Sequence, residues 1–181
     1  DHTGSTLVVG AVFFAFQIYC DFSGYSDIAL GTSKLFGIQL LRNFAFPYFS
    51  RDIAEFWRRW HISLSSWFKD YVYIPLGGSK SSTFIRIRNT MVIFLLSGFW
   101  HGANWTFIAW GLLNALYFIP LLVTERNRKN LDIVASGRIL PSWKEFLQMS
   151  GTFALVTFGW IFFRAESLSA AIGYVKGIFT R

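Results

Sequence analysis

The chain of 181 residues is long enough for one domain, and 53% of its residues are apolar. Ordinary soluble domains contain about 45–50% apolar residues. The net charge is +7, but the basic residues form short clusters beside apolar runs, as in membrane proteins and not as in nucleic-acid binders. We therefore expect an all-α, polytopic membrane helical bundle, with one membrane-embedded domain over residues 1–181, contact with the lipid bilayer and no nucleic acid. Since the chain opens with Asp1 and not with Met, we expect a piece of a longer membrane protein.

The first apolar run, Leu7–Tyr19, is short for a complete span. It meets the polar stretch Cys20–Asp27 before apolar sequence resumes at Ile28–Leu41. Two carboxylates and a Ser-Gly-Tyr-Ser sequence predict a span that is broken or ended beside a polar cavity, because non-helical backbone in a membrane must be satisfied by protein or trapped water. Asp27 has two interpretations: it caps the next helix, or it lies on a substrate path.

The segment Arg51–Gly78 combines many aromatic residues with basic ones. Its apolar side chains recur every three or four residues, which predicts one amphipathic helix with an aromatic face, begun by Asp52 and ended by Pro75 and the following glycines. Basic, Trp-rich helices of this kind lie in the membrane interface, so we expect its tryptophans to be surface anchors. The apolar positions are Ile53, Trp57, Trp60, Leu64, Trp67 and Tyr71.

Three polar residues of this segment are candidates for a binding role. Arg58 and Arg59 either bind a phosphate-bearing donor or pair with lipid phosphates, since arginine recognises phosphate through paired hydrogen bonds. His61 follows Trp60 at the edge of the aromatic face and is a weak signal by itself.

The stretch Asn89–Thr124 contains no Asp, Glu, Lys or Arg, is too long for one span and suits two. Small and polar residues from Gly98 to Asn104 predict a break, and basic connectors on both sides of the stretch predict a hairpin. About ten residues of helix climb roughly half of the hydrocarbon layer, which places His101 deep. An ionisable side chain at that depth indicates a functional site, although a core histidine bonded to a backbone carbonyl is the alternative.

The last apolar segment, Phe146–Phe163, predicts a single span that ends at Arg164. Ser167 is placed to cap a final amphipathic helix over Leu168–Phe179. Gly98 and Gly102 form a pair of small residues that allows close helix approach.

The sequence lacks the motifs GxSxG, GxxxxGK[ST], HExxH and CxxC. No third ligand at motif spacing accompanies His61 and His101, so we expect no metal site. A neutral imidazole can take a proton from a hydroxyl nucleophile and pass it to a leaving group. This chemistry suits acyl transfer, with Asn104 or an N–H group at Gly102 stabilising the oxyanion.

Four blocks, in this order, carry a family resemblance: YCDFSGYSDIALG, RNFAFPYFSRDIAEFWRRWHISLSSWFKDYVYIPLGG, GFWHGANWTFIAWG and GWIFFRAESL. Together they resemble the membrane-bound O-acyltransferase family over about Tyr19–Leu168. The PLGG sequence favours the alginate O-acetyltransferase branch, whose relatives acetylate other exopolysaccharides and peptidoglycan. A sister branch moves D-alanine onto teichoic acids.

The resemblance implies that His101 is the family's essential histidine, set in a tunnel through the membrane, and that His61 is its second histidine. It implies an acyl donor that is a cytoplasmic thioester such as acetyl-CoA, no bound cofactor, and delivery to a relay or polysaccharide-modifying protein outside the cell (inner) membrane. Family members are longer, so their amino-terminal spans are missing from this chain. The expected substrate contacts are Asn104, Trp100, Arg58, Arg59, Trp60 and Asp27.

Three other functions stay open at this point. The first is D-alanyl transfer to teichoic acid by a related family member. The second is a transporter or channel subunit, because interrupted helices and polar residues at the midplane occur in transporters too. The third is a non-catalytic scaffold for an acetylating partner, which predicts that both histidines tolerate substitution.

Overall fold

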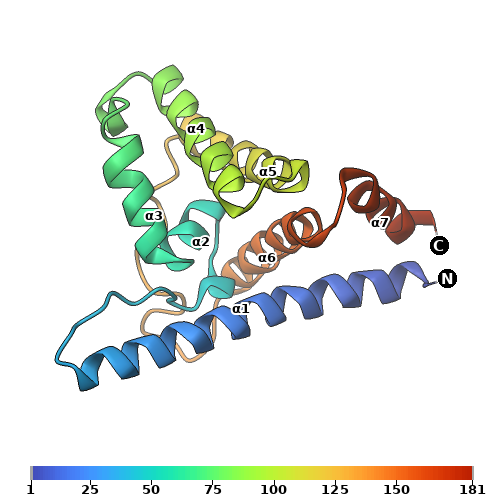
Figure 1. Cartoon of the computed structure of the whole chain (residues 1–181), viewed down its shortest axis with the longest axis horizontal. Coiled ribbons are helices and arrows are strands. Elements are labelled where there is room, and N and C mark those ends of the chain that lie inside the picture. Colours follow the sequence, from blue (N-terminus) through green and yellow to red (C-terminus); the bar gives the residue numbers. More distant parts are fainter. Residues whose placement is uncertain (1, 181) are drawn as a thin grey trace.

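The computed structural model describes residues 2–180, and within that range the chain is helical, with no strand (Figure 1). Three helices are long and apolar enough to cross a membrane by length and composition: α1 (Gly4–Leu35), α5 (Trp105–Val123) and α6 (Trp143–Arg164). The expected all-α membrane bundle is confirmed. The remaining elements are η1 (Pro47–Phe49), α2 (Ile53–Arg59), α3 (Ile62–Phe68), η2 (Lys69–Tyr73), η3 (Gly78–Lys80), α4 (Thr83–His101) and α7 (Leu168–Thr180).

Helix α1 is continuous, so the predicted break at Cys20–Asp27 is wrong. The polar residues from Cys20 to Asp27 lie on the surface of this helix and do not interrupt it. Asp21 lines the main cavity, together with Gln17 one turn earlier. Ser23 donates its hydroxyl to the Cys20 carbonyl at 3.4 Å within the helix. Asp27 lies inside α1 and is exposed, so it caps no helix.

The predicted single amphipathic helix is two short helices, α2 and α3, and the prediction of one helix is therefore wrong. Asp52 does cap α2, accepting the Glu55 N–H at 2.7 Å. The interruption falls at His61, whose φ of 44° is left-handed. An extended segment holds this corner, because Ala45 N–H donates to the Arg59 carbonyl and Ile62 N–H donates to the Asn43 carbonyl, both at 3.0 Å.

The turn between α2 and α3 coincides with a position in or against the core for two of the three tryptophans of this segment. Trp60 is only 4% exposed and belongs to the aromatic core, where its ring lies 5.1 Å from that of Trp160. Trp57 packs against the same core, with its ring 5.8 Å from Trp110. Neither is a surface anchor, contrary to expectation. Trp67, on α3, is 50% exposed.

Helices α4 and α5 form the predicted hairpin, joined at residues 102–104 with His101 at the inner turn. The close approach depends on Gly98 and Gly111, because a Cβ atom at Gly98 would overlap the Phe107 carbonyl and one at Gly111 would overlap the Phe94 carbonyl. Gly102, the expected partner of Gly98, instead forms the helix end. The uncharged part of α4 is about 20 Å long, which is shorter than the hydrocarbon layer of about 30 Å. Of the two spans predicted over Asn89–Thr124, only α5 is long and apolar enough to cross a membrane.

We expect the substitution Gly98→Ala to lower thermal stability, because the two backbones must separate to admit the methyl group. Overpacking of this kind costs about 1–3 kcal/mol. The matched control is Gly24→Ala in α1, where an added Cβ meets open space and alanine favours the helix. Thermal unfolding of both variants in detergent tests this expectation, and equal midpoints would contradict it.

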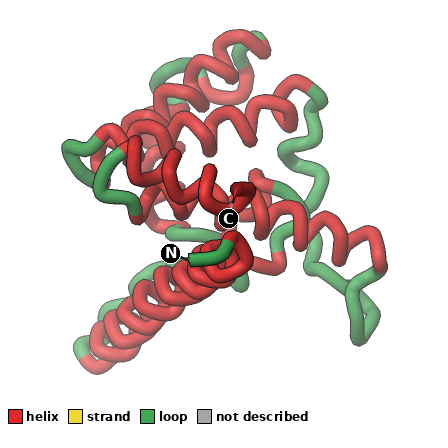
Figure 2. The backbone as a smooth tube through the Cα atoms, turned by 90° about the vertical axis from the view of Figure 1, so that its right-hand side faces the viewer, coloured by secondary structure: helices red, strands yellow, loops and turns green. Residues whose placement is uncertain are grey.

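The two C-terminal helices lie where the sequence predicts them, although α6 begins at Trp143, three residues before the predicted span, with a cap that was not predicted. Ser142 and Glu145 form a capping box at the start of α6, and Ser167 accepts the Ala170 N–H at 3.2 Å at the start of α7. Tyr174 of α7 donates its hydroxyl to the Leu7 carbonyl of α1 at 2.6 Å. The start of α1 and the end of α7 consequently lie close together at one end of the molecule (Figures 1 and 2).

Candidate active site

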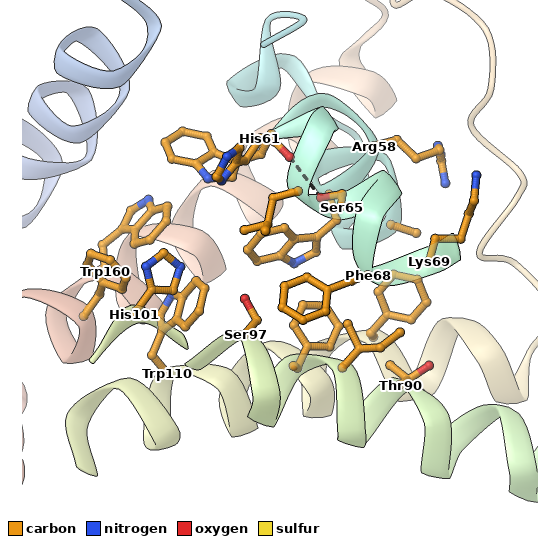
Figure 3. Close-up of a pocket in the computed structure, with 18 of the residues that line it drawn as sticks. Arg58, His61, Ser65, Phe68, Lys69, Thr90, Ser97, His101, Trp110 and Trp160 are labelled. Carbon is orange, nitrogen blue, oxygen red and sulfur yellow. Dashed lines mark hydrogen bonds between the residues drawn. The ribbon is translucent and has the colours of Figure 1, made fainter. Parts of the chain in front are cut away.

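The main cavity has a volume of about 1010 Å³ and lies between α1, α2, α3, α4, α5 and α6 (Figure 3). Helix α4 supplies one continuous wall, because its lining residues recur at three- and four-residue spacing and so share one helix face. At 1.5 Å per residue, this wall from Thr90 to His101 is about 16 Å long. The α4 residues on it are Thr90, Ile93, Phe94, Ser97 and His101.

His101 is the last residue of α4 and lies half-buried at one end of this wall. Aromatic rings fix its orientation: Trp110 and Phe163 meet the imidazole edge to face at centroid distances of 5.2 and 5.0 Å. Phe163 belongs to the last turn of α6. The imidazole is therefore nearer to the C-terminal end of α6 than to its middle.

His61 reaches the same cavity from the corner between α2 and α3. Its left-handed conformation is uncommon outside glycine, although histidine is among the residues enriched there. Such conformations cost about 1–3 kcal/mol and concentrate at functional sites. Phe22 of α1 packs edge to face on the imidazole at 4.7 Å. The strained corner thus turns His61 out of the α2 helix and toward His101.

Both imidazoles are chemically available. Among residues 2–180, neither makes a hydrogen bond to another residue, so neither is a core histidine bonded to a backbone carbonyl. On the same cavity wall, the Trp57 indole N–H is buried and has no hydrogen-bond partner in the described part of the chain. A buried donor left unpaired costs about 1–3 kcal/mol. The Trp160 indole N–H, on the same wall, is likewise buried and without a partner in the described part of the chain. The cavity therefore holds two free imidazoles and two unpaired indole donors in its wall.

The end of the cavity away from His101 is cationic, with Arg58 and Lys69 on its lining (Figure 3). Arg128 also lines the cavity and follows Asn127, which accepts a hydrogen bond from Arg58. Arg58 donates to two carbonyl oxygens, of Asn127 at 2.8 Å and of Asn130 at 2.7 Å, so its charge stays uncompensated by these partners. Arg59 is different: it donates to Glu55 at 2.6 Å and to the Ala45 carbonyl at 3.3 Å, and it does not line the cavity. The geometry thus favours Arg58 over Arg59 as a contact for an anion.

A buried ion cluster supports the helix that carries these residues. Glu55, 1% exposed, accepts hydrogen bonds from Arg51 and Arg59, and Arg51 also pairs with Asp132 at 2.9 Å. The hydrogen bond from Arg51 lowers the pKa of the Asp132 carboxyl below its ordinary value, so this group stays ionised at neutral pH. The cluster anchors α2 just before the corner at His61.

The structure brings together His101, His61, Trp60 and Arg58 of the predicted site, all on the cavity wall. The other predicted contacts lie elsewhere. Asn104 caps α5 at the Thr106 N–H and donates to the Glu166 carbonyl at 3.0 Å, and the Gly102 N–H donates to the Phe99 carbonyl. The predicted oxyanion donors are therefore engaged in ending and starting helices. Trp100 and Asp27 are exposed and do not line the cavity.

Several lining residues were not predicted. Asp21, not Asp27, is the carboxylate of α1 on the cavity wall, and Ser97, Trp110 and Trp160 also line it. The spacing of Ser97 and His101, four residues apart on α4, was the signal that could have identified Ser97. Within residues 2–180, no group of three or more His, Cys, Asp or Glu side chains is arranged to hold a metal ion.

The sequence of this chain is similar to those of several known proteins. The chain is 45% identical over 172 residues to the probable alginate O-acetylase AlgI of Pseudomonas aeruginosa, covering 95% of this chain and 31% of the relative. It is 42% identical to the peptidoglycan O-acetyltransferase of Helicobacter pylori, over 91% of the chain and 30% of the relative. The teichoic acid D-alanyltransferase of Bacillus subtilis is 32% identical, over 84% of the chain and 40% of the relative.

The chain thus spans about a third of the length of these O-acetylating relatives. The sequence pattern described as MBOAT, membrane-bound O-acyltransferase family, matches residues 2–161. This match covers most of the chain, including both histidines and the cavity wall of α4. The chain is a membrane protein and belongs to the membrane-bound O-acyltransferase family.

Proposed function

We propose that this chain forms the acyl-transfer site of a membrane O-acyltransferase, with His101 as the catalytic base and His61 assisting it or shaping the donor side. One observation carries the proposal. Two imidazoles, one at the end of α4 and one at the corner between α2 and α3, line one elongated cavity, and neither makes a side-chain hydrogen bond within residues 2–180. A site of this kind can accept a proton from a substrate.

In the proposed reaction, the acceptor hydroxyl attacks the thioester carbonyl while His101 removes the hydroxyl proton. The carbon–sulfur bond breaks, and the proton passes from the imidazolium to the departing thiolate. General acid–base catalysis of this kind contributes about 10²–10⁴-fold. Packing of His101 against Trp110 and Phe163 holds the ring where this transfer is required.

The shape and charge of the cavity support an elongated, anionic donor. A wall of about 16 Å along α4 separates His101 from the cationic end at Arg58, Lys69 and Arg128. A donor such as acetyl-CoA carries its phosphates far from its thioester. Phosphates at the cationic end would leave the thioester beside the histidines, and arginine is well suited to bind phosphate.

A second cavity, of about 460 Å³, supports entry of the acceptor from the opposite side. It shares Phe14 and Trp160 with the main cavity and is also lined by Arg164, at the C-terminal end of α6. The cationic end of the main cavity lies away from His101, whose ring packs against Phe163 in the last turn of α6. We infer that the donor enters at the cytoplasmic face of the inner membrane and that the acyl group leaves at the outer face, toward a protein that relays it to a surface polysaccharide.

Acetyl is the proposed acyl group, because identity to the alginate and peptidoglycan O-acetylating relatives, 45% and 42%, exceeds the 32–36% to the D-alanyltransferases. D-Alanyl transfer to teichoic acid is the alternative within the family.

The experiment uses membrane vesicles from cells that produce the full-length protein. Inverted vesicles expose the cytoplasmic face, so we expect them to consume acetyl-labelled acetyl-CoA added outside and to pass the label to the lumenal side. Right-side-out vesicles should leave the thioester intact, and vesicles lacking the protein are the control. Uptake of a solute without thioester cleavage would indicate a transporter and overturn the proposal.

A further inference from the structure

The connector between α5 and α6 runs along the side of α2 before α6 begins (Figure 1). We call its residues 126–132 the strap. Asn127, Arg128 and Leu131 of the strap line the main cavity at its cationic end. The strap contains no regular helix, so its own backbone does not fix its position.

Side chains of α2 and of the two residues before it bind the strap at three of its residues. Arg58 donates to the carbonyl oxygens of Asn127 and Asn130 at 2.8 and 2.7 Å. The Asn130 side-chain amide donates to Asp52 Oδ2 at 2.6 Å. Arg51 donates to the backbone and side-chain oxygens of Asp132 at 2.8 and 2.9 Å.

The residues that bind the strap also stabilise α2 or line the cavity. Asp52 begins α2 through its other oxygen, Oδ1, which accepts the Glu55 N–H. Arg51 belongs to the buried ion cluster, and Arg58 lies on the cavity wall. Strap position and the position of Arg58 are therefore coupled, since each fixes the other through direct hydrogen bonds.

We propose that Asn130 is a positioning residue: by tying the strap to Asp52, it holds Arg128 and Arg58 where they bind the anionic end of the donor. This inference rests on the proposed function. Asn130 does not line the cavity, so its effect on the reaction passes through the strap. The strap then controls donor affinity and leaves the chemistry at His101, at the opposite end of the cavity, unchanged.

The test is made in the full-length protein and swaps the side chains of Asn130 and Asp52 between the two positions. Asn130→Asp puts a carboxylate against the Asp52 carboxylate and should release the strap. The double variant Asp52→Asn with Asn130→Asp restores an amide facing a carboxylate, and asparagine caps a helix about as well as aspartate. Since hydrogen bonds to charged groups are the stronger class, we expect the single variant to raise KM for acetyl-CoA roughly tenfold with little change in kcat, and the exchange to reverse this.

A second measurement reports the strap directly. Arg126, Arg128 and Lys129 are exposed trypsin sites within it. Asn130→Asp should speed trypsin cleavage there in inverted vesicles, and the exchange variant should slow it again. Faster cleavage with an unchanged KM, an unchanged cleavage rate, or a fall in kcat with KM unchanged would each overturn the proposal. If the unmodified protein turns over no thioester, the proposed function itself fails, and the cleavage rates still decide whether Asn130 ties the strap.

Discussion

Replacing His101 by glutamine should abolish acetyl transfer while the full-length protein still reaches the membrane. Glutamine retains much of the volume and the hydrogen-bonding groups of histidine but cannot take a proton at neutral pH. Loss of a general base lowers the rate by about 10²–10⁴-fold. His101→Ala should give the same loss of activity, with an additional packing defect beside Trp110 and Phe163. The measurement is label transfer from acetyl-CoA in vesicles, normalised to the amount of protein.

Phe99→Ala is the matched control for these variants. Phe99 lies on the same last turns of α4, is 66% exposed and does not line the cavity. It therefore reports what a large truncation at this helix end does without touching the imidazole. Near-normal acetylation by the His101→Gln variant would rule out His101 as the base, and equal losses in the His101 and Phe99 variants would indicate a structural effect.

The hairpin and its histidine could be predicted because their signals are local. An uncharged run too long for one span, interrupted by small and polar residues, specifies two helices and a turn, and His101 was at that turn. The caps at Asp52 and Ser167 were similarly local, since one side chain bonds an N–H three residues later. The predictions of a broken first span and of one helix over Arg51–Gly78 are wrong, because these features depend on contacts between residues distant in the sequence. In α1, the polar residues from Cys20 to Asp27 resemble a break, and the structure shows them on a continuous helix where Asp21 alone of the two carboxylates lines the cavity.

The corner at His61 could not be predicted from nearby sequence, because neither glycine nor proline marks it. Its hydrogen-bond partners, Asn43 and Ala45, belong to an extended segment far enough away that only the tertiary structure connects them. The same corner moves Trp57 and Trp60 from the expected membrane surface into the core. Within α2, before the corner, Arg58 lines the cavity and Arg59 turns toward Glu55 four residues earlier, because neighbouring positions on a helix face different directions. Adjacent residues with the same chemistry therefore acquired different roles.

Replacing Glu55 by glutamine should strongly destabilise the protein. Glu55 is 1% exposed and is the shared partner of Arg51 and Arg59, with contacts of 3.1 and 2.6 Å. Removing one member of a buried ion group costs about 3–5 kcal/mol, because the remaining charges stay buried without compensation. We expect a clearly lower midpoint of thermal unfolding in detergent and a smaller amount of protein in the membrane.

Asp70→Asn provides the matched control, since it also replaces a carboxylate by an amide in an ion pair. Its pair with Lys69 is 3.3 Å long, but both side chains are more than half exposed. Exposed pairs contribute less than about 1 kcal/mol, so this variant should unfold near the midpoint of the unmodified protein. Equal stability of the Glu55→Gln and Asp70→Asn variants would show that burial of the cluster does not stabilise α2. A selective loss in Glu55→Gln should also lower acyl transfer, because α2 fixes Arg58 and the corner that turns His61 toward His101.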